Sequence, residues 1–260
     1  MGSPHDSEAR VSAGTFFVVL SPVWNAKPWV ERCVDSVRRQ TYSNIRHIWV
    51  DDASTDGTAA VLKQIVRNDD LLLNAERRYP SYNVWNALTN HVREDCLVGL
   101  LDGDDWLIDE TAVERMVLEH KACEVVWSAH EVHEYDSHGE LVVKPEPDNP
   151  LHRMTGNVRT LGWEPTHFFS FKRHRFLQIH TLEFQADDHT WFQAMYDMAL
   201  SVPLIEMAGW SRCCHIAQPL YAYNRLRPDN DDKVRRTIQQ RTADIIRQRR
   251  PYLTQEEERS

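Results

Sequence analysis

The chain has 260 residues, of which 42% are hydrophobic and 27% charged, so it is long enough to bury a core and has an ordinary globular composition. It contains no run of 18 apolar residues, so no membrane-spanning helix or transmembrane anchor is expected. The net charge of −9 is uneven, because residues 225–250 carry nine Lys or Arg against four Asp or Glu.

The two ends and the cysteines give few signals. Residues 1–14 lack the charged start and apolar stretch of a secretory signal, and we expect them to be flexible. The five cysteines contain no Cys-x-x-Cys pair, so neither a zinc ribbon nor a disulfide framework is predicted. We therefore expect free thiols and a cytoplasmic protein.

Apolar runs and helical spacings alternate along the first half. Residues 15–22 form an apolar run that stops at a proline, which is typical of a buried strand. Val30, Cys33, Val34 and Val37 then follow the spacing of one helix face. The alternation continues with strands expected at 45–52, 71–73, 97–107 and 124–129, and with helices around 61–66, 81–92 and 113–120. This order predicts an α/β fold with a mostly parallel, Rossmann-like central sheet flanked by helices.

The second half is less regular. It predicts two strands around a turn at 133–143, a strand leading into a helix at 167–176, a helix at 190–202, a strand at 218–225 and a basic helix at 231–250. We therefore expect one fused globule with a flexible start (1–14), a nucleotide-binding half (15–130), a smaller mixed half (131–225) and a basic helix and tail (226–260).

Two predicted strands end in clustered carboxylates, Asp51-Asp52 and, about 50 residues on, the stretch 102–105 that reads Asp-Gly-Asp-Asp. Because the carboxyl ends of parallel strands share one edge, these acids should converge. Like charges about 4 Å apart repel by roughly 1–4 kcal/mol per pair, so a compensating cation is expected. Oxygen ligands favour Mn²⁺ or Mg²⁺, and Mg²⁺ usually completes its shell with phosphate.

Each acidic cluster also has a simpler interpretation. Either one alone fits a turn with a helix cap, and Asp56 is the expected cap of the following helix. Neither G-x-G-x-x-G nor a P-loop occurs, so a nucleotide would be held by acids and metal rather than by a glycine loop.

The stretch "VVLSPVWNAKPWVERCVDSVRRQTYSNIRHIWVDDASTDGTAAVL", followed by "LLDGDDWL", resembles the opening of family 2 glycosyltransferases, which have the GT-A fold. The resemblance covers roughly residues 15–130 and includes the Asp-x-Asp (DxD) strand end. It implies a metal-dependent, inverting transfer of a sugar from a nucleotide-diphosphate sugar, with UDP-sugars favoured, to an acceptor hydroxyl.

The resemblance also implies roles for individual residues. The nucleobase, usually uracil, would meet Asp51 and Asp52, in a pocket lined by Pro22 and Trp24 and followed by Asn25. Asp102 would face the ribose and join Asp104 at the metal that bridges the diphosphate, across Gly103. Asp105 would support metal or sugar. Arg77 or Arg78 would reach a phosphate or the base, and Asn86 matches the last position of the family's Gly-x-x-x-Ala-Arg-Asn.

Inverting transfer needs a general base opposite the leaving diphosphate. The family's Glu-Asp pair at a helix start resembles Asp187-Asp188, with Asp188 the first choice and the alternative that both acids only favour the helix N-terminus. The expected acceptor-side residues are Trp163, Thr166, His167 and Trp191, some of which would instead be core. His215 is a weak candidate for a third metal ligand.

The acceptor is left open by the sequence. Family members mostly build glycans, which favours a glycan or saccharide acceptor. The basic helix allows an alternative, a hydroxymethylated base in DNA that is flipped into the pocket. From other classes, a nucleotidyltransferase and a non-catalytic sugar-binding protein remain as alternatives.

Overall fold

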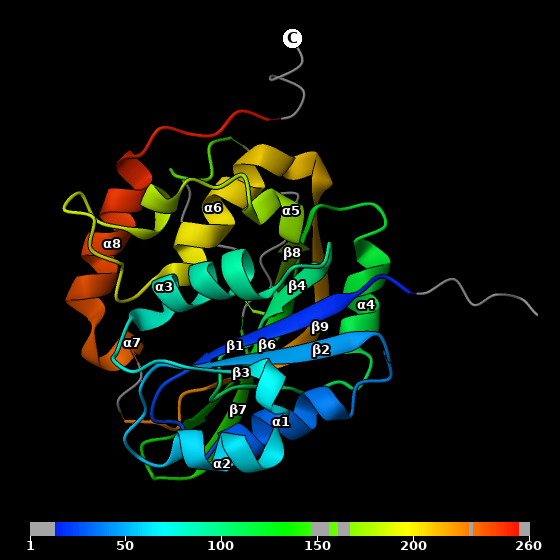
Figure 1. Cartoon of the computed structure of the whole chain (residues 1–260), viewed down its shortest axis with the longest axis vertical. Helices are drawn as coiled ribbons and strands as arrows, with labels where there is room; N and C mark the ends of the chain where they lie inside the picture. The colour runs from blue at the N-terminus through cyan, green and yellow to red at the C-terminus, as the bar shows by residue number, and fades with distance from the viewer. Residues whose placement is uncertain (1–13, 147–155, 161–166, 229–230, 255–260) are drawn as a thin grey trace, which may run out of the picture.

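The computed structural model describes residues 14–146, 156–160, 167–228 and 231–254. Within these ranges, nine strands form one mixed sheet in the order β3-β2-β1-β4-β8-β6-β9-β5, and β7 pairs with β6 outside this path. Helices lie on both sides of the sheet, with α1 and α2 on one side and α3, α6 and α8 on the other (Figure 1).

The first half confirms the predicted alternation. Its elements are β1 (Phe17–Val23), α1 (Val30–Arg38), β2 (Ile45–Asp51), α2 (Thr58–Ile65), η1 (Asn68–Asp70), β3 (Leu71–Leu73), α3 (Tyr79–Asn86), η2 (Ala87–His91), β4 (Leu97–Leu100), β5 (Trp106–Leu107) and α4 (Ala112–Glu119). Strands β3, β2, β1 and β4 pair in parallel. Their carboxyl ends therefore meet at one edge, as the sequence predicts.

The second half completes the sheet with antiparallel pairings and one parallel pairing, that of β6 with β9. Its elements are β6 (Val125–Tyr135), β7 (Leu141–Pro145), β8 (Phe169–Lys172), α5 (Arg173–Phe176), η4 (Thr181–Phe184), α6 (Tyr196–Ala208), η5 (Trp210–Arg212), β9 (Cys213–Asn224), α7 (Asp231–Val234) and α8 (Arg236–Gln248). Strand β8 lies between β4 and β6 and is antiparallel to both. The predicted fourth and fifth strands are thus not neighbours, because local patterns carry no information on strand order.

Several predicted element boundaries differ from the structure, and two of these differences lie next to the site. The expected strand at 97–107 is divided into β4 and β5 by the acidic turn. The helix expected at 190–202 begins only at Tyr196, because Met195 has a left-handed φ of 60° and the preceding residues form a turn. The apolar spacing through 191–195 belongs to that turn, which packs against the core without being helical.

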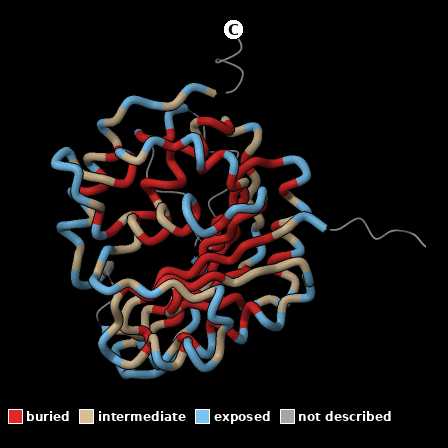
Figure 2. The backbone as a smooth tube through the Cα atoms, viewed as in Figure 1, coloured by how far each residue is buried: buried red, intermediate tan, exposed pale blue. Residues whose placement is uncertain are grey.

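The core forms two layers that follow the alternation of side chains along β1. Val18 and Leu20 pack with residues of α3 and α6, whereas Phe17 and Val19 pack with α1, α2 and α4 on the other face. The strands form a continuous buried band between the helices (Figure 2). Burial on both faces explains why the central strands are nearly all apolar.

The expectation of free thiols is wrong for one pair. Cys123 and Cys214, which are 91 residues apart in sequence, form a disulfide, while Cys33, Cys96 and Cys213 are free and buried. The pairing of β6 with β9 brings the two cysteines together, and no local spacing predicts that contact. Across the described ranges, no helix combines the length and apolar character that crossing a membrane requires.

Candidate active site

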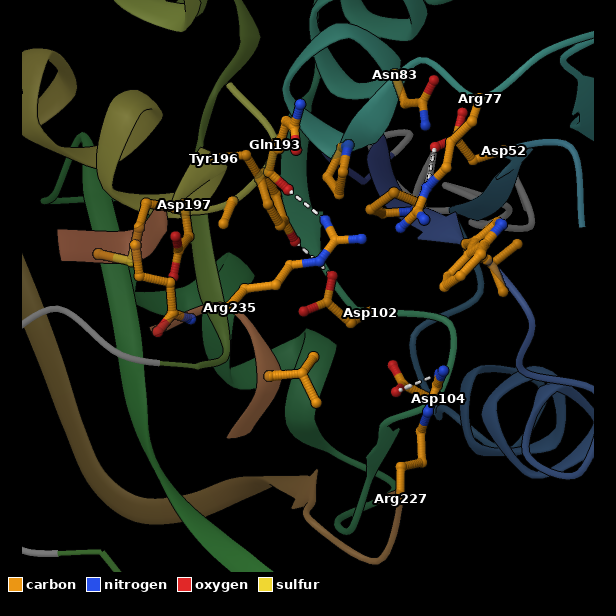
Figure 3. Close-up of a pocket in the computed structure, with 18 of the residues that line it drawn as sticks. Asp52, Arg77, Asn83, Asp102, Asp104, Gln193, Tyr196, Asp197, Arg227 and Arg235 are labelled. Carbon is orange, nitrogen blue, oxygen red and sulfur yellow. Dashed lines mark hydrogen bonds and ion pairs between the residues drawn. The ribbon is translucent and has the colours of Figure 1, made fainter. Parts of the chain in front are cut away.

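A cavity of about 380 Å³ opens at the carboxyl ends of β1, β2 and β4 (Figure 3). Its walls come from these strand ends, α3, the start of α6, β9 and the segment after β9. The predicted site residues that line it are Pro22, Trp24, Asp52, Arg77, Asp102, Asp104 and His167. Sheet topology thus brings together side chains that are up to 145 positions apart in the chain.

Other predicted residues lie elsewhere. Among those that the structure describes, the following do not line the cavity: Asn25, Asp51, Arg78, Asn86, Gly103, Asp105, Asp187, Asp188 and Trp191. Trp163 and Thr166 lie outside the described residues.

The adjacent carboxylates after β2 have different surroundings. Each residue is 2% exposed, but only Asp52 lines the cavity. The Ser54 backbone N–H donates to Asp51 Oδ2 at 3.1 Å, whereas Asp51 Oδ1 has no hydrogen-bond partner within the described part of the chain. Burial raises the pKa of Asp51. Asp51 therefore belongs to the turn, and Asp52 is the acid that faces the cavity.

Asn25 fastens the loop after β1 to the turn after β2. It has a left-handed φ of 49°, its Oδ1 accepts the backbone N–H of Thr55 at 2.8 Å, and its own N–H donates to Ser54 Oγ at 2.9 Å. This role is structural and differs from the expected contact with the nucleotide. It holds the adjacent Trp24 at the cavity wall.

Asp52 organises the loop between β3 and α3. Its Oδ1 accepts from Asn74 Nδ2 at 2.9 Å and from the backbone N–H of Arg78 at 2.7 Å, and its Oδ2 accepts the Tyr79 N–H at 2.9 Å. Arg77 Nε lies 3.9 Å from Oδ2, and its Cζ lies 3.4 Å from the centroid of the Trp24 ring. The Arg77 guanidinium stacked on the Trp24 ring thus forms a flat cationic wall of the cavity beside the Asp52 carboxylate.

Asn83, rather than Asn86, is the amide of α3 that lines the cavity. Asn83 is 1% exposed, and its Oδ1 accepts from Asn74 Nδ2 at 2.7 Å. Asn86 instead accepts from Asn90 Nδ2 at 2.9 Å on the helix surface. Motif matching missed Asn83, although its i, i+3 spacing from Pro80 places both residues on one helix face.

The acidic turn after β4 gives each carboxylate a separate partner. The Tyr196 hydroxyl donates to Asp102 Oδ1 at 2.5 Å, and Arg227 Nη1 donates to Asp104 Oδ2 at 2.9 Å. A Cβ at Gly103 would lie 2.6 Å from Val23 Cβ, so the turn passes against β1 only with glycine there. Asp102 and Asp104 therefore reach the cavity from either side of Gly103.

Asp105 is placed differently from its expected position beside metal or sugar. It is 1% exposed, and its oxygens accept from the Tyr221 hydroxyl and from the backbone N–H of Asn224, the latter at 2.7 Å. Burial beside Asp104 and Asp102 raises the pKa of Asp105 well above its usual value. Asp105 thus joins the acidic turn to β9.

Two arginines that motif matching did not assign to the site also line the cavity. Arg227 pairs with Asp104, and Arg235 Nη1 donates to the carbonyl oxygen of Gln193 at 3.3 Å (Figure 3). Both follow β9, in the segment whose basic composition is visible in the sequence. Guanidinium groups beside carboxylates at a strand edge offer the charge that a diphosphate requires.

The predicted general base lies outside the cavity. Asp188 is exposed on a turn closed by the Gln185–Trp191 bridge, and its Oδ1 accepts from the Thr190 hydroxyl at 2.6 Å, a bond that lowers its pKa. Asp197, the second residue of α6, lines the cavity instead. The acid at the helix start is thus Asp197, nine residues after Asp188, because the turn before α6 delays the start of the helix.

The aromatic residues of the second half divide between cavity and core. His167 lines the cavity and stacks on Tyr221 and Tyr223, with ring centroids 4.7 and 5.4 Å away, and burial lowers its pKa to about 3. Trp191 packs against Trp85 at 5.3 Å. His215 lies beside Trp127 at 5.8 Å, and it is not among the described cavity residues.

The donor set at the acidic turn fits a hard divalent cation only with help from a ligand. In the described ranges, no group of three His, Cys, Asp or Glu side chains is arranged to hold a metal. Asp102 and Asp104 nevertheless present two carboxylates to one cavity, which is the number that Mg²⁺ commonly takes from protein before phosphate and water complete its shell.

Comparisons with known proteins agree with this geometry. A family model described as glycosyl transferase family 2 matches residues 18–199. Glycosyltransferase GlyA of Streptococcus pneumoniae is 29% identical over 107 residues, which are 40% of this chain and 15% of GlyA.

Two solved structures share the fold. S. aureus TarS 1-349 in complex with UDP-GlcNAc gives a TM-score of 0.57 at 15% identity, covering 84% of this chain and 61% of that one. The mannosyltransferase PcManGT from Pyrobaculum calidifontis, in complex with GDP-Man and Mn²⁺, gives 0.56 at 19% identity, covering 92% and 66%. The chain thus spans only part of each relative, and these likenesses show the GT-A fold.

Proposed function

Because the chain belongs to glycosyl transferase family 2, we propose that it transfers a sugar from a nucleotide-diphosphate sugar to an acceptor hydroxyl with inversion. The observation that carries the proposal is the meeting of Asp52, the Asp102–Asp104 pair and Asp197 in one cavity at the carboxyl edge of the sheet. The family match supports the reaction class, and the shared cavity supports the role that we propose for each group.

The donor would lie along the cavity from β2 towards α6. Its base would rest against Arg77 and Trp24, where Asp52 accepts a ring N–H. Arg227 and Arg235 would pair with the oxygens of the diphosphate, which spreads the negative charge of the leaving group. Of the donors considered, UDP-sugars are favoured, as the resemblance of the opening motifs already implies.

In the proposed reaction, Asp197 replaces Asp188 and Asp187 as the general base. The acceptor oxygen bonds to the anomeric carbon as the bond from that carbon to the diphosphate breaks. The diphosphate leaves with the bonding electrons, and the hydroxyl proton passes to the Asp197 carboxylate. Tyr196, which precedes Asp197 and donates to Asp102, would fix the distance between base and donor.

Asp104, with Asp102, would hold Mn²⁺ or Mg²⁺, which supplies positive charge to the departing diphosphate when bound. Arg227 occupies Asp104 Oδ2 in the described structure, so the arginine would turn towards phosphate when the cation binds. The chain's own task here is to present two carboxylates and a mobile counter-charge.

A saccharide acceptor has more support than DNA. Two arginines of the basic segment form ion pairs within the protein, Arg247 with Asp244 at 3.5 Å and Arg249 with Glu183 at 3.5 Å. Fewer basic groups than the sequence suggests would therefore remain to bind the phosphates of DNA. The aromatic cluster of His167 and Tyr223 at the cavity suits the apolar face of a sugar ring.

The test compares two isosteric variants, Asp197→Asn and Asp188→Asn. Because the acceptor is unidentified, the readout is UDP release from UDP-sugars with Mn²⁺, supported by UDP binding in a calorimeter. Asp197→Asn should lower UDP release at least about 100-fold, the usual scale of general-base loss, with unchanged UDP affinity.

Asp188→Asn is the matched control, since it lies on an exposed turn and should release UDP at the wild-type rate. Loss of UDP release in Asp188→Asn but not in Asp197→Asn would instead identify Asp188 as the general base. If UDP binds and neither wild type nor variant turns over any UDP-sugar, the chain is a binding protein, and the proposal fails.

A further inference from the structure

The side-chain amide of Asn83 is buried at the cavity with an unused donor. Asn83 is 1% exposed, it lines the cavity, and its Nδ2 has no hydrogen-bond partner within the described part of the chain. Leaving such a buried donor unpaired is unfavourable, so a ligand acceptor would be strongly favoured there. Asn83 extends from α3 beside Asp52 and Arg77 (Figure 3).

The orientation of this amide is set by its neighbours. Asn74 Nδ2 has two hydrogens, and it donates one to Asp52 Oδ1 at 2.9 Å and the other to Asn83 Oδ1 at 2.7 Å. An ionised carboxylate only accepts, so the Asn74 nitrogen must face Asp52, and Asn83 must turn its oxygen to Asn74. The Asn83 nitrogen is therefore the end that meets a ligand.

Asp52, beside Asn83, has little capacity left to accept further hydrogen bonds. A carboxylate offers about four acceptor positions, and three are taken, by Asn74 and by the backbone N–H groups of Arg78 and Tyr79. One position on Oδ2 remains for a ligand N–H. The site thus presents one acceptor and one donor next to each other.

We infer that Asn83 reads the nucleobase of the donor and selects the imide edge of uracil. That edge has one ring N–H flanked by carbonyl oxygens, which matches a single acceptor on Asp52 and the donor on Asn83. Guanine also presents a ring N–H beside a carbonyl oxygen, N1–H with O6, but its N2–H on the other side of N1–H would need a second acceptor position, which Asp52 lacks. Cytosine has a hydrogen-bond acceptor rather than a donor at ring N3, so it would place an acceptor against the Asp52 carboxylate.

This inference rests on the proposed function, and thymine shares the same imide edge. Calorimetry should therefore compare UDP, dTDP, CDP, GDP and ADP with the wild-type chain and Mn²⁺. UDP or dTDP should bind at least about 10-fold more tightly than GDP and CDP, the scale of one or two buried polar contacts. The ratio of the UDP and dTDP affinities then identifies which of the two pyrimidine nucleotides carries the donor sugar.

The role of Asn83 is tested with 2-thio-UDP and 4-thio-UDP, in which sulfur replaces one carbonyl oxygen and accepts a hydrogen bond poorly. One of the two should bind wild type several-fold more weakly than UDP. Asn83→Ala should weaken UDP about 5- to 15-fold and bind UDP and both thio analogues equally, because the discriminating donor is gone. Asn83→Asp, which keeps the acceptor for Asn74, should do the same.

Asn86→Ala on the same helix is the matched control and should keep the wild-type pattern. Equal binding of UDP and both analogues by wild type, discrimination that survives in Asn83→Ala, or tighter binding of GDP than UDP would each overturn the inference alone. Failure of every nucleoside diphosphate to bind would instead overturn the proposed function, and the inference with it.

Discussion

The hydroxyl of Tyr196 donates a hydrogen bond of 2.5 Å to Asp102, which ties the first residue of α6 to the end of β4. These residues are 94 positions apart, and the bond joins the two halves of the chain inside the cavity. Burial raises the pKa of Tyr196 well above its usual value, so the phenol remains a donor at neutral pH. The position of Asp197 relative to the acidic turn depends on this contact.

Tyr196→Phe should therefore impair both stability and turnover. Loss of one buried hydrogen bond to a charged group should lower the free energy of unfolding by about 1–3 kcal/mol. UDP release should fall about 10-fold, because a small displacement of a base is enough to cost that much. Urea denaturation and the UDP-release assay measure the two effects. Tyr82→Phe, whose ring packs edge-on against Trp191 at 5.1 Å, is the control, and equal behaviour of both variants would contradict the prediction.

Asp51 should make stability depend on pH. Its folded-state pKa is raised by burial, so the unfolded chain loses its proton first as pH rises. The wild type should accordingly lose stability relative to Asp51→Asn from about pH 4, near the unfolded pKa, upward through the folded pKa. Urea titrations at pH 4, 5, 6 and 7 give the difference. A wild-type advantage that grows with pH would show that Asp51 has gained a partner.

Arg227→Met should strengthen metal binding. Arg227 donates to Asp104 Oδ2, so the guanidinium and a divalent cation compete for one carboxylate. Removing the competitor should lower, several-fold, the Mn²⁺ concentration that gives half-maximal UDP binding. UDP binding is measured by the fluorescence of Trp24 in the cavity wall. Arg247→Met on α8 is the control and should leave the midpoint unchanged. A higher midpoint in Arg227→Met would mean that phosphate contact outweighs competition.

Arg159→Leu should destabilise the helical layer. Arg159 is 1% exposed, donates to both oxygens of Glu206 at 2.8 Å and to the carbonyl of Ile246 at 2.7 Å, and so joins α6 to α8. Removing it strands a buried carboxylate, which should cost about 3–5 kcal/mol of unfolding free energy. Exposed Arg67, whose Nε lies 3.9 Å from Asp70 Oδ2, gives the control, since Arg67→Ala should change the free energy of unfolding by less than about 1 kcal/mol.

Periodicity was enough to predict the parallel half of the sheet. The helix face formed by Val30, Cys33, Val34 and Val37 is buried as its spacing predicts. The position of β8 between β4 and β6 was not predictable, because antiparallel insertion depends on long-range packing that leaves no local pattern. The cysteine pair shows the same limit, since only the β6–β9 register brings Cys123 to Cys214.

At the site, the predicted strand ends placed the carboxylate clusters at the edge that carries the cavity, but they did not show which of the carboxylates line it. Sequence treats Asp51 and Asp52 as a pair, but side chains alternate along a strand, so adjacent residues face different ways. Asp104 and Asp105 instead diverge within the acidic turn, where Asp104 faces the cavity and Asp105 is buried. Asn83 and Asp197 were missed because the family's motif spacing was applied to this chain without allowance for two segments. The β3–α3 loop and the turn before α6 shift the residues that follow them relative to that spacing.

The cavity has two origins within the chain. Its floor comes from residues inside the family match, which ends at 199, whereas Tyr223, Arg227, Val234, Arg235 and Gln239 come from beyond that range. A chimera that exchanges residues 200–260 between relatives would therefore keep the base-reading wall and replace the wall beside the diphosphate. Engineering of this protein can thus alter the cationic side of the cavity separately from residues 18–199, which carry Asp52, Asp102, Asp104 and Asp197.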